Sequence, residues 1–263
     1  MTDSNPPTDR SAGAFPRALA GRTALVTGAA RRVGAAIVRA LHGAGAQCIV
    51  HYHRSAAEAD ALVASLVTDR PGSALAVAAD LRDLAAIDAL ARTAIGAFGH
   101  VDILVNNAST FYATPVGEIT AAHWDDLVGS NLKAPLFLSQ ALAPQLRLRE
   151  GLILNIADIH GARPLRRYPV YSVAKAGLIM LTKSLARELG PQVRVNAISP
   201  GPVMWPEDGG DDAELRRKIL DRTILRRPGS PQDIALAALY FACDAPFVTG
   251  QVLAVDGGRS VAG

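Results

Sequence analysis

The chain has 263 residues, of which 49% are hydrophobic and 19% are charged, and its formal net charge at pH 7 is +3. This composition suits a large buried core, and the small, dispersed positive charge argues against a nucleic-acid partner. No apolar run reaches the roughly 18 residues of a membrane span. The two cysteines, Cys48 and Cys243, stand in apolar stretches without metal-ligand spacing, so we expect free thiols in a reducing cytoplasm and no metal site.

The N-terminal segment differs in composition from the rest of the chain. Residues 1–20 are rich in Pro, Ser, Thr and Ala and lack the apolar centre of a secretory signal. They predict a flexible tail. Residues 21–263 predict one domain, because single α/β domains of this size are common.

From Arg22 onward, short apolar runs alternate with segments of helical spacing. The predicted strands are Thr23–Thr27, Gln47–Tyr52, Ala74–Ala79, Val101–Val105, Leu152–Ile156, Val193–Ile198 and Val252–Val255. The predicted helices are Val33–Leu41, Ala56–Val67, Leu84–Phe98, one long or two abutting helices over Ala121–Leu146, Val170–Leu189 and Pro231–Phe241. Apolar strands that alternate with helices indicate an α/β fold with a doubly wound parallel sheet and helices on both faces.

The turn after the first strand carries glycines where a nucleotide can bind. It runs from Gly28 to Gly34 and contains Arg31, Arg32 and Val33. Glycines let the backbone approach a diphosphate, and the N-terminus of the following helix favours its negative charge. Two glycines six residues apart are also compatible with an ordinary turn.

The second predicted strand ends in basic and hydroxyl side chains, namely His53, Arg54 and Ser55. An acidic residue near this place would bind the ribose 2′-hydroxyl of NAD, and none is present. Arginine gives charge-assisted bonds to a phosphate, so this segment favours NADPH, with Arg31 as a second cation. A solvated basic turn is the alternative.

Further coenzyme contacts are expected in the loops after later strands, because ligands of such sheets bind at the strands' C-terminal ends. Asp80 and Leu81 follow the third strand and are placed near adenine. Asn107, Ala108 and Ser109 follow the fourth strand.

A carboxyl group, a phenol and an amine form the candidate catalytic set. Tyr171 and Lys175 are four residues apart on a predicted helix and so share one face. A nearby ammonium lowers the pKa of a tyrosine, which we expect to make Tyr171 a proton donor near neutral pH. Asp158 follows the strand Leu152–Ile156 at the same end of the sheet.

From Arg22 to Gly258 the sequence resembles the short-chain dehydrogenase/reductase family, which has a Rossmann-like fold. The motifs that carry the resemblance are TGAARRVG (27–34), Asp80, NNA (106–108), Asn131, YSVAK (171–175) and NAISPGP (196–202). The resemblance implies that Tyr171 donates a proton, that Lys175 lowers its pKa and binds the nicotinamide ribose, and that Asn131 holds a water that relays protons. It also implies coenzyme contacts at Pro200 and Gly201.

Three departures from the family pattern narrow the resemblance to its pteridine reductase subgroup. Asp158 replaces the usual serine, Arg32 replaces a glycine of the turn, and Ser109 replaces the glycine of the NNAG loop. HYHRSAAEA (51–59) and NNAS followed by Phe111-Tyr112 are also similar to that subgroup. The expected substrate contacts are Arg32, Ser109, Phe111, Asp158, Tyr171, Pro202 and Trp205.

Among these substrate contacts, Phe111 is expected to stack the substrate ring against the nicotinamide, with plain loop packing as the alternative. The segment Gly201–Asp212 predicts a lid. Its Trp205 either lines the pocket or lies in a subunit contact.

The function that follows is an NADPH-dependent reduction of a C=N bond in a small pterin or folate. The alternatives are a carbonyl reductase of the 3-oxoacyl type and a non-catalytic NADP(H)-binding sensor. The resemblance also implies a homotetramer, and we expect a cytoplasmic protein without membrane or nucleic-acid partners.

Overall fold

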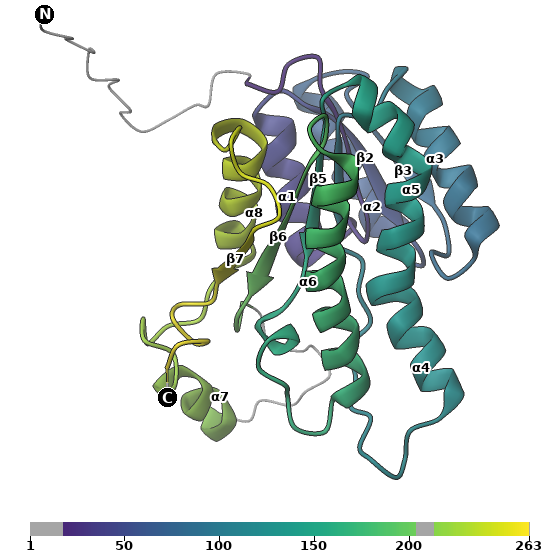
Figure 1. Cartoon of the computed structure of the whole chain (residues 1–263). Coiled ribbons are helices and arrows are strands. Elements are labelled where there is room, and N and C mark those ends of the chain that lie inside the picture. Colours follow the sequence, from purple (N-terminus) through teal and green to yellow (C-terminus); the bar gives the residue numbers. More distant parts are fainter. Residues whose placement is uncertain (1–17, 204–212, 263) are drawn as a thin grey trace, which may run out of the picture.

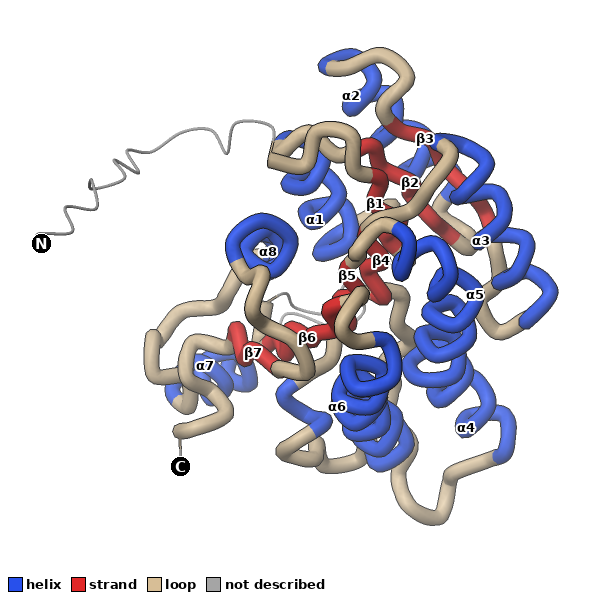
Figure 2. The backbone as a smooth tube through the Cα atoms, turned by 45° about the horizontal axis from the view of Figure 1, so that its top comes forward, coloured by secondary structure: helices blue, strands red, loops and turns tan. Residues whose placement is uncertain are grey.

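The computed structural model describes residues 18–203 and 213–262, which form a parallel sheet between two layers of helices (Figures 1 and 2). Within these ranges, seven strands pair in the order β3-β2-β1-β4-β5-β6-β7, and every neighbouring pair is parallel. The strands are β1 (Thr23–Val26), β2 (Gln47–Tyr52), β3 (Ala74–Ala78), β4 (Ile103–Asn106), β5 (Leu152–Ile156), β6 (Arg194–Pro200) and β7 (Val252–Val255). The predicted doubly wound sheet is confirmed.

The helices divide between the two faces of the sheet. One face carries α1 (Arg32–Gly43), α2 (Ala56–Asp69) and α8 (Pro231–Leu239), whose apolar side chains share one core cluster with β1 and β2. The other carries α3 (Leu84–Phe98), α5 (Ala134–Leu148) and α6 (Pro169–Leu189). Both faces of the central strands are therefore buried, which explains why those strands read as unbroken apolar runs.

The long helical stretch predicted over residues 121–146 is two abutting helices. The chain passes from α4 (Ala121–Val128) through one π-helical turn, η1 (Gly129–Lys133), into α5. A short 3-10 turn, η2 (Ile159–Gly161), follows β5, and a second π turn, η3 (Tyr240–Asp244), follows α8. Isolated π turns inside helices are frequent at functional sites, and η1 contains Asn131.

The C-terminal ends of the strands face the end of the molecule at which α7 (Ala213–Asp221) and the C-terminal segment lie (Figure 1). The loops that carry the predicted site residues meet at this edge. Of the described helices, none is long and apolar enough to cross a membrane.

The boundary of the predicted N-terminal tail needs a correction. Leu19 is buried in the core, and its N–H donates to the carbonyl of Ala44 (2.9 Å), so the packed chain begins before residue 21. Residues 1–17 lie outside the described part of the chain.

Candidate active site

The glycine turn between β1 and α1 touches the loop after β4. Gly28 has a φ of +59°, and a Cβ there would lie 2.8 Å from the Cα of Ala108. At Gly34, a Cβ would lie 2.6 Å from Nδ2 of Asn107 and would also meet the carbonyl of Gly28. Both positions require glycine, because backbone atoms fill the space at Gly28, and backbone atoms together with the hydrogen-bonded amide of Asn107 fill it at Gly34.

Hydrogen bonds fix these two loops to each other. The Asn107 side-chain amide donates to the carbonyls of Thr27 (2.8 Å) and Gly28 (3.0 Å). The N–H groups of Asn107 and Ala108 donate to the Thr27 hydroxyl (2.9 and 3.0 Å). Asn107, which the sequence predicts as a coenzyme contact, therefore uses its side-chain amide to hold the shape of the glycine turn.

His51 is a positioning residue that the sequence analysis did not single out. Its Nδ1 accepts the N–H of Gly28 (3.1 Å), so Nε2 carries the proton and donates to the carbonyl of Ala79 (3.1 Å). Burial lowers the pKa of His51 to about 4, so the ring is neutral and keeps this tautomer. His51 belongs to the HYHRS string (51–55), but the inward direction of its side chain follows from the register of β2 in the sheet.

The start of α1 is suited to bind a diphosphate. Arg31 occupies the N-cap, and no side chain of the described residues caps the first turn. Arg32 follows with a φ of +54°, a left-handed conformation that explains why glycine is the usual residue there. The uncapped N–H groups of this first turn, which includes the half-buried Val33, can donate to phosphate oxygens.

At the adenosine end, the structure brings His53 and Asp80 together. Nε2 of His53 lies 3.7 Å from Oδ2 of Asp80, while Arg54 is exposed and Ser55 half-buried. Arg31 lies 3.5 Å from Glu58, so part of its charge is compensated. Leu81 is buried.

Asp158, Tyr171 and Lys175 converge at the C-terminal end of β5. The Tyr171 hydroxyl donates to Oδ2 of Asp158 (2.8 Å), and Oδ1 of Asp158 accepts the N–H of His160 (2.8 Å). The Lys175 Nζ donates to the carbonyl of Ile156 (2.9 Å) and lies 5.7 Å from the centre of the Tyr171 ring. The α6 helix thus brings Tyr171 into contact with Asp158 and places Lys175 beside the Tyr171 ring.

The electrostatics correct one expectation, namely that Lys175 lowers the pKa of Tyr171. Burial and then the negative charge of Asp158 raise the pKa of Tyr171 well above its usual value. Burial also lowers the pKa of Lys175 to about 8, against an opposing effect of Asp158. Tyr171 therefore keeps its proton, which it shares with the carboxylate.

Asn131 is buried in the π turn η1 and fixes the loop after β4. Its amide donates to the carbonyls of Thr110 and Leu127 (both 2.9 Å), and its Oδ1 accepts the Ser109 hydroxyl (2.7 Å). The amide that the resemblance assigns to a proton-relaying water is thus engaged with protein groups, and it positions Ser109.

Phe111 lies beside Tyr171, the predicted proton donor. Its ring stacks on Tyr168 with centroids 4.6 Å apart and meets Tyr171 edge to face at 4.8 Å. The Phe111 side chain is still 45% exposed, so the ring remains accessible to a flat substrate. Tyr168 completes this aromatic wall and was not predicted; only its nearness in sequence to Tyr171 indicates it.

The loop after β6 follows the strand that neighbours β5 in the sheet. Gly201 packs so tightly that a Cβ would lie 2.6 Å from the Cα of Asp256, and Pro200 ends the strand. Pro202 accepts the N–H of Gly229 (3.0 Å). Trp205 and residues 204–212 of the predicted lid lie outside the described residues. Within the described ranges, no three His, Cys, Asp or Glu side chains gather where a metal ion could bind.

Comparisons with known proteins match this chain over nearly its whole length. A family model described as enoyl-(acyl carrier protein) reductase matches residues 28–260. Pteridine reductase 1 of Leishmania tarentolae is 36% identical over 90% of this chain and 96% of its own length. L-xylulose reductase of Bos taurus is 38% identical (91% and 97% covered), and 3-oxoacyl-(acyl-carrier-protein) reductase of Synechocystis sp. is 35% identical (92% and 98% covered).

Solved structures agree with these sequence matches. A double mutant of a short-chain dehydrogenase/reductase from Serratia marcescens superposes with a TM-score of 0.86 at 35% identity, covering 92% of this chain and 99% of that chain. Relatives of similar identity bear the names of different substrates, so the substrate has to be argued from the residues of the site.

Proposed function

The chain belongs to the short-chain dehydrogenase/reductase family, and we propose that within this family of oxidoreductases it is an NADPH-dependent pteridine reductase. Its proposed substrate is a dihydropterin or dihydrofolate, whose C=N bond takes a hydride at carbon and a proton at nitrogen. A single observation carries the proposal: a carboxylate, Asp158, accepts the hydroxyl of Tyr171 at 2.8 Å.

This carboxylate favours a ring nitrogen over a carbonyl oxygen. Reduction of a ketone develops negative charge on oxygen, which needs hydrogen-bond donors nearby, and the ionised side chain of Asp158 would repel it. A reduced ring nitrogen needs a proton instead. Asp158 and Tyr171 hold a proton between their oxygens and can pass it on directly or through water.

The coenzyme site is compatible with NADPH. The uncapped start of α1 and the glycine at position 28 fit the diphosphate. His53, Arg54 and Ser55 are the proposed contacts of the 2′-phosphate, and their side chains are not fully buried, which supports this role. NADPH supplies the hydride when it is bound.

The remaining roles fall to the groups around the catalytic pair. Lys175, held by the carbonyl of Ile156, is positioned to bind the nicotinamide ribose and to return a proton to the pair. Phe111 offers its ring face to the bicyclic substrate. Ser109 and Arg32 lie on the two loops that flank this space and are the proposed polar contacts of the pterin.

An assay of substrate classes tests the proposal. Purified protein is mixed with NADPH and with dihydrobiopterin, dihydrofolate or a 3-oxoacyl thioester, and the consumption of NADPH is followed by absorbance. We expect turnover with a pterin. Turnover of the ketone together with none of any pterin would refute the proposal.

The carbonyl reductase of the 3-oxoacyl type is the second candidate, because a relative with that name is 35% identical. The variant Asp158→Ser separates the two. In a pteridine reductase it lowers pterin turnover, whereas in a carbonyl reductase it raises ketone turnover because a hydroxyl replaces the repelling carboxylate. If the protein is instead a non-catalytic sensor, the variant Tyr171→Phe and the wild type give the same result in every activity assay.

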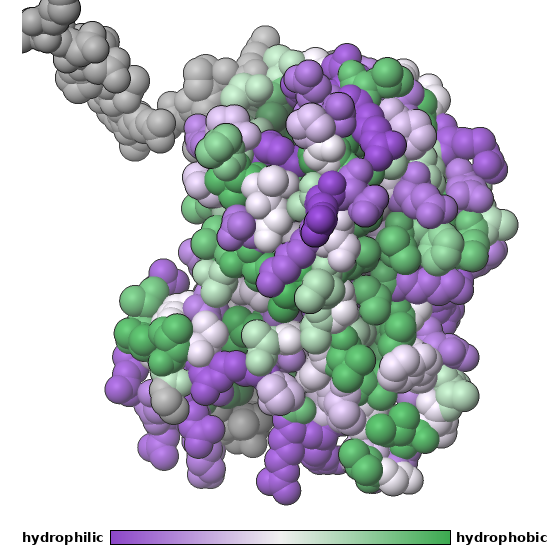
Figure 3. Space-filling model, viewed as in Figure 1, coloured by the Kyte–Doolittle hydropathy of each residue, from purple (hydrophilic) through white to green (hydrophobic). Residues whose placement is uncertain are grey.

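We also propose that the protein is a cytoplasmic homotetramer. Apolar side chains are exposed on α5 and α6, including Leu136, Leu148, Val173 and Met180, and hydrophobic surface lies among polar side chains over these helices (Figure 3). Exposed apolar patches mark contact surfaces. Sedimentation of the purified protein measures the assembly state.

A further inference from the structure

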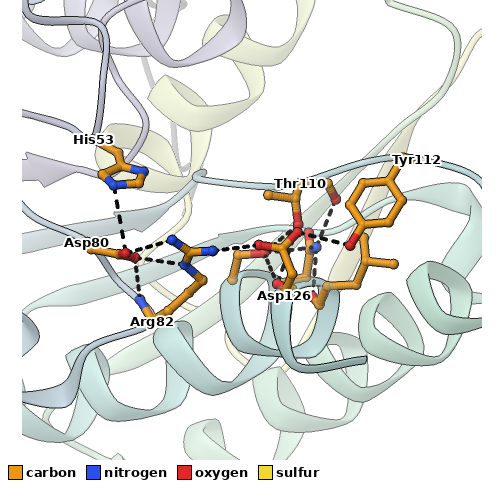
Figure 4. Close-up of polar contacts among 9 residues, drawn as sticks. His53, Asp80, Arg82, Thr110, Tyr112 and Asp126 are labelled. Carbon is orange, nitrogen blue, oxygen red and sulfur yellow. Dashed lines mark hydrogen bonds and ion pairs between the residues drawn. The ribbon is translucent and has the colours of Figure 1, made fainter. Parts of the chain in front are cut away.

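Arg82 lies between two carboxylates at the adenosine end of the site (Figure 4). Its Nε donates to Oδ1 of Asp80 (3.0 Å) and its Nη2 to Oδ2 (2.7 Å), which forms a two-pronged pair. Its Nη1 donates to Asp126 on α4 (3.1 Å). The guanidinium therefore has a fixed orientation, with Asp80 as its main partner.

Asp80 is a difficulty for a phosphorylated coenzyme. Its Oδ2 lies 3.7 Å from Nε2 of His53, and His53 adjoins Arg54 and Ser55, the proposed 2′-phosphate contacts. The Arg82 guanidinium holds the pKa of Asp80 well below its usual range, so this carboxylate is ionised at every physiological pH. An ionised carboxylate that contacts a proposed phosphate ligand, here His53, costs phosphate-binding energy unless a cation compensates it.

We propose that Arg82 is a coenzyme-specificity residue, because it neutralises Asp80 and thereby admits a 2′-phosphate beside His53. The inference rests on the proposed use of NADPH. Arg82 engages both oxygens of the carboxylate, which leaves the positive charge of Arg54 in the β2–α2 loop to dominate the field at the phosphate. Without Arg82, Asp80 would compete with the phosphate for His53.

The local geometry makes Arg82 suited to this role. The N–H of Arg82 donates to Oδ1 of Asp80 (3.0 Å), so the turn itself presents the side chain to its partner. Asp126 fixes the far side of the guanidinium and is in turn bonded by the Tyr112 hydroxyl (3.1 Å). The alternative is a purely structural role, in which Arg82 only ties this turn to α4. The test has to distinguish the two roles.

The test compares coenzyme affinities by calorimetry, without any substrate. The dissociation constants of NADPH and NADH are measured for the wild type and for the variants Arg82→Gln, Asp80→Asn and Asp80→Asn/Arg82→Gln. The variant Arg92→Gln, which removes an equal charge from an exposed position on α3, is the matched control.

Arg82→Gln is expected to weaken NADPH by about five- to tenfold, the effect of roughly one unit charge in an exposed site, and to change NADH less than about twofold. The double variant is expected to recover most of the NADPH affinity, because the carboxylate that Arg82 neutralises is gone. Recovery also shows that the variants fold. Arg92→Gln should bind both coenzymes like the wild type.

Two results would overturn the proposed role of Arg82 without affecting the coenzyme proposal. If Arg82→Gln loses NADPH and NADH affinity equally, Arg82 is a structural tie. If the double variant binds NADPH as weakly as Arg82→Gln does, Arg82 binds the phosphate directly. A wild type that prefers NADH would overturn the coenzyme proposal together with this inference. Failure to reduce pterins leaves these measurements intact, so the two failures are distinguishable.

Discussion

The variant Asp158→Asn removes the charge and the acidity of the proposed catalytic carboxyl group and keeps its shape. Asp158 accepts two hydrogen bonds of 2.8 Å, from the Tyr171 hydroxyl and from the His160 N–H. An amide oxygen retains one of them, and the Tyr171 hydroxyl can rotate to accept from the amide nitrogen. Because charge-assisted bonds are roughly twice as strong as neutral ones, we expect a loss of about 1–2 kcal/mol in the free energy of unfolding.

The effect on catalysis is expected to be larger. A positioned proton donor is worth about a hundred- to ten-thousandfold in rate, or roughly 3–5 kcal/mol of barrier. The proposed donor is the Asp158–Tyr171 pair, and an amide at position 158 cannot take up the Tyr171 proton and pass it on. We therefore predict that kcat for dihydropterin falls by that factor while the Kd of NADPH stays within about twofold of the wild type.

Steady-state kinetics and a coenzyme titration measure both quantities. Asp125→Asn, at an exposed position of α4, is the control and should behave like the wild type. A kcat for Asp158→Asn within about threefold of the wild type would mean that the carboxyl group moves no proton, and the reasoning from its contact with Tyr171 would fail.

Three further predictions concern other parts of the molecule. Burial lowers the pKa of Lys175 to about 8 from an ordinary value of 10.5, so kcat/KM should fall above about pH 8 as the ammonium is lost, and a rate that stays flat to about pH 10 would contradict its role. Between these pKa values the unfolded chain binds more protons, so the free energy of unfolding should rise with pH as the cost of burying the ammonium disappears. Gly34→Ala should weaken the binding of NADPH at least roughly tenfold, because the new Cβ would meet Asn107. Gly43→Ala is the control, since it has open space around it and should leave the affinity unchanged; equal affinities for both variants would count against the packed turn. Asp102 is 1% exposed and pairs with Arg22 and Arg149 (both 2.9 Å). Asp102→Asn should therefore lower the free energy of unfolding, measured with urea, by about 3–5 kcal/mol, and a decrease below about 1 kcal/mol would show that the cluster contributes little.

The sequence predicted the order of strands and helices because the central strands are buried on both faces. Their apolar runs and the helical spacing between them are local signals. It predicted less well where one helix passes into another. Gly129, Ser130 and Asn131 are poor helix formers and indicate an interruption, but they do not distinguish a π turn from a loop, and the contact of Asn131 with the carbonyl of Thr110 depends on packing.

The residues of the candidate site could be named from their spacing, but their electrostatics could not. The separation of Tyr171 and Lys175 puts both on one face of α6, whereas the pKa of Tyr171 depends on how deeply the ring is buried and on its contact with Asp158. The same limit applies to Arg82. Its charge is visible in the sequence, but its position between Asp80 and Asp126 depends on the packing of α4.

The transfer of label from the coenzyme tests the central claim most directly. NADPH deuterated at the reactive carbon of the nicotinamide is incubated with the protein and a dihydropterin, and the product is analysed by NMR. The account predicts deuterium on the pterin carbon next to the newly protonated nitrogen. A pterin recovered unlabelled, under conditions in which a ketone offered alongside it becomes a labelled alcohol, would contradict it.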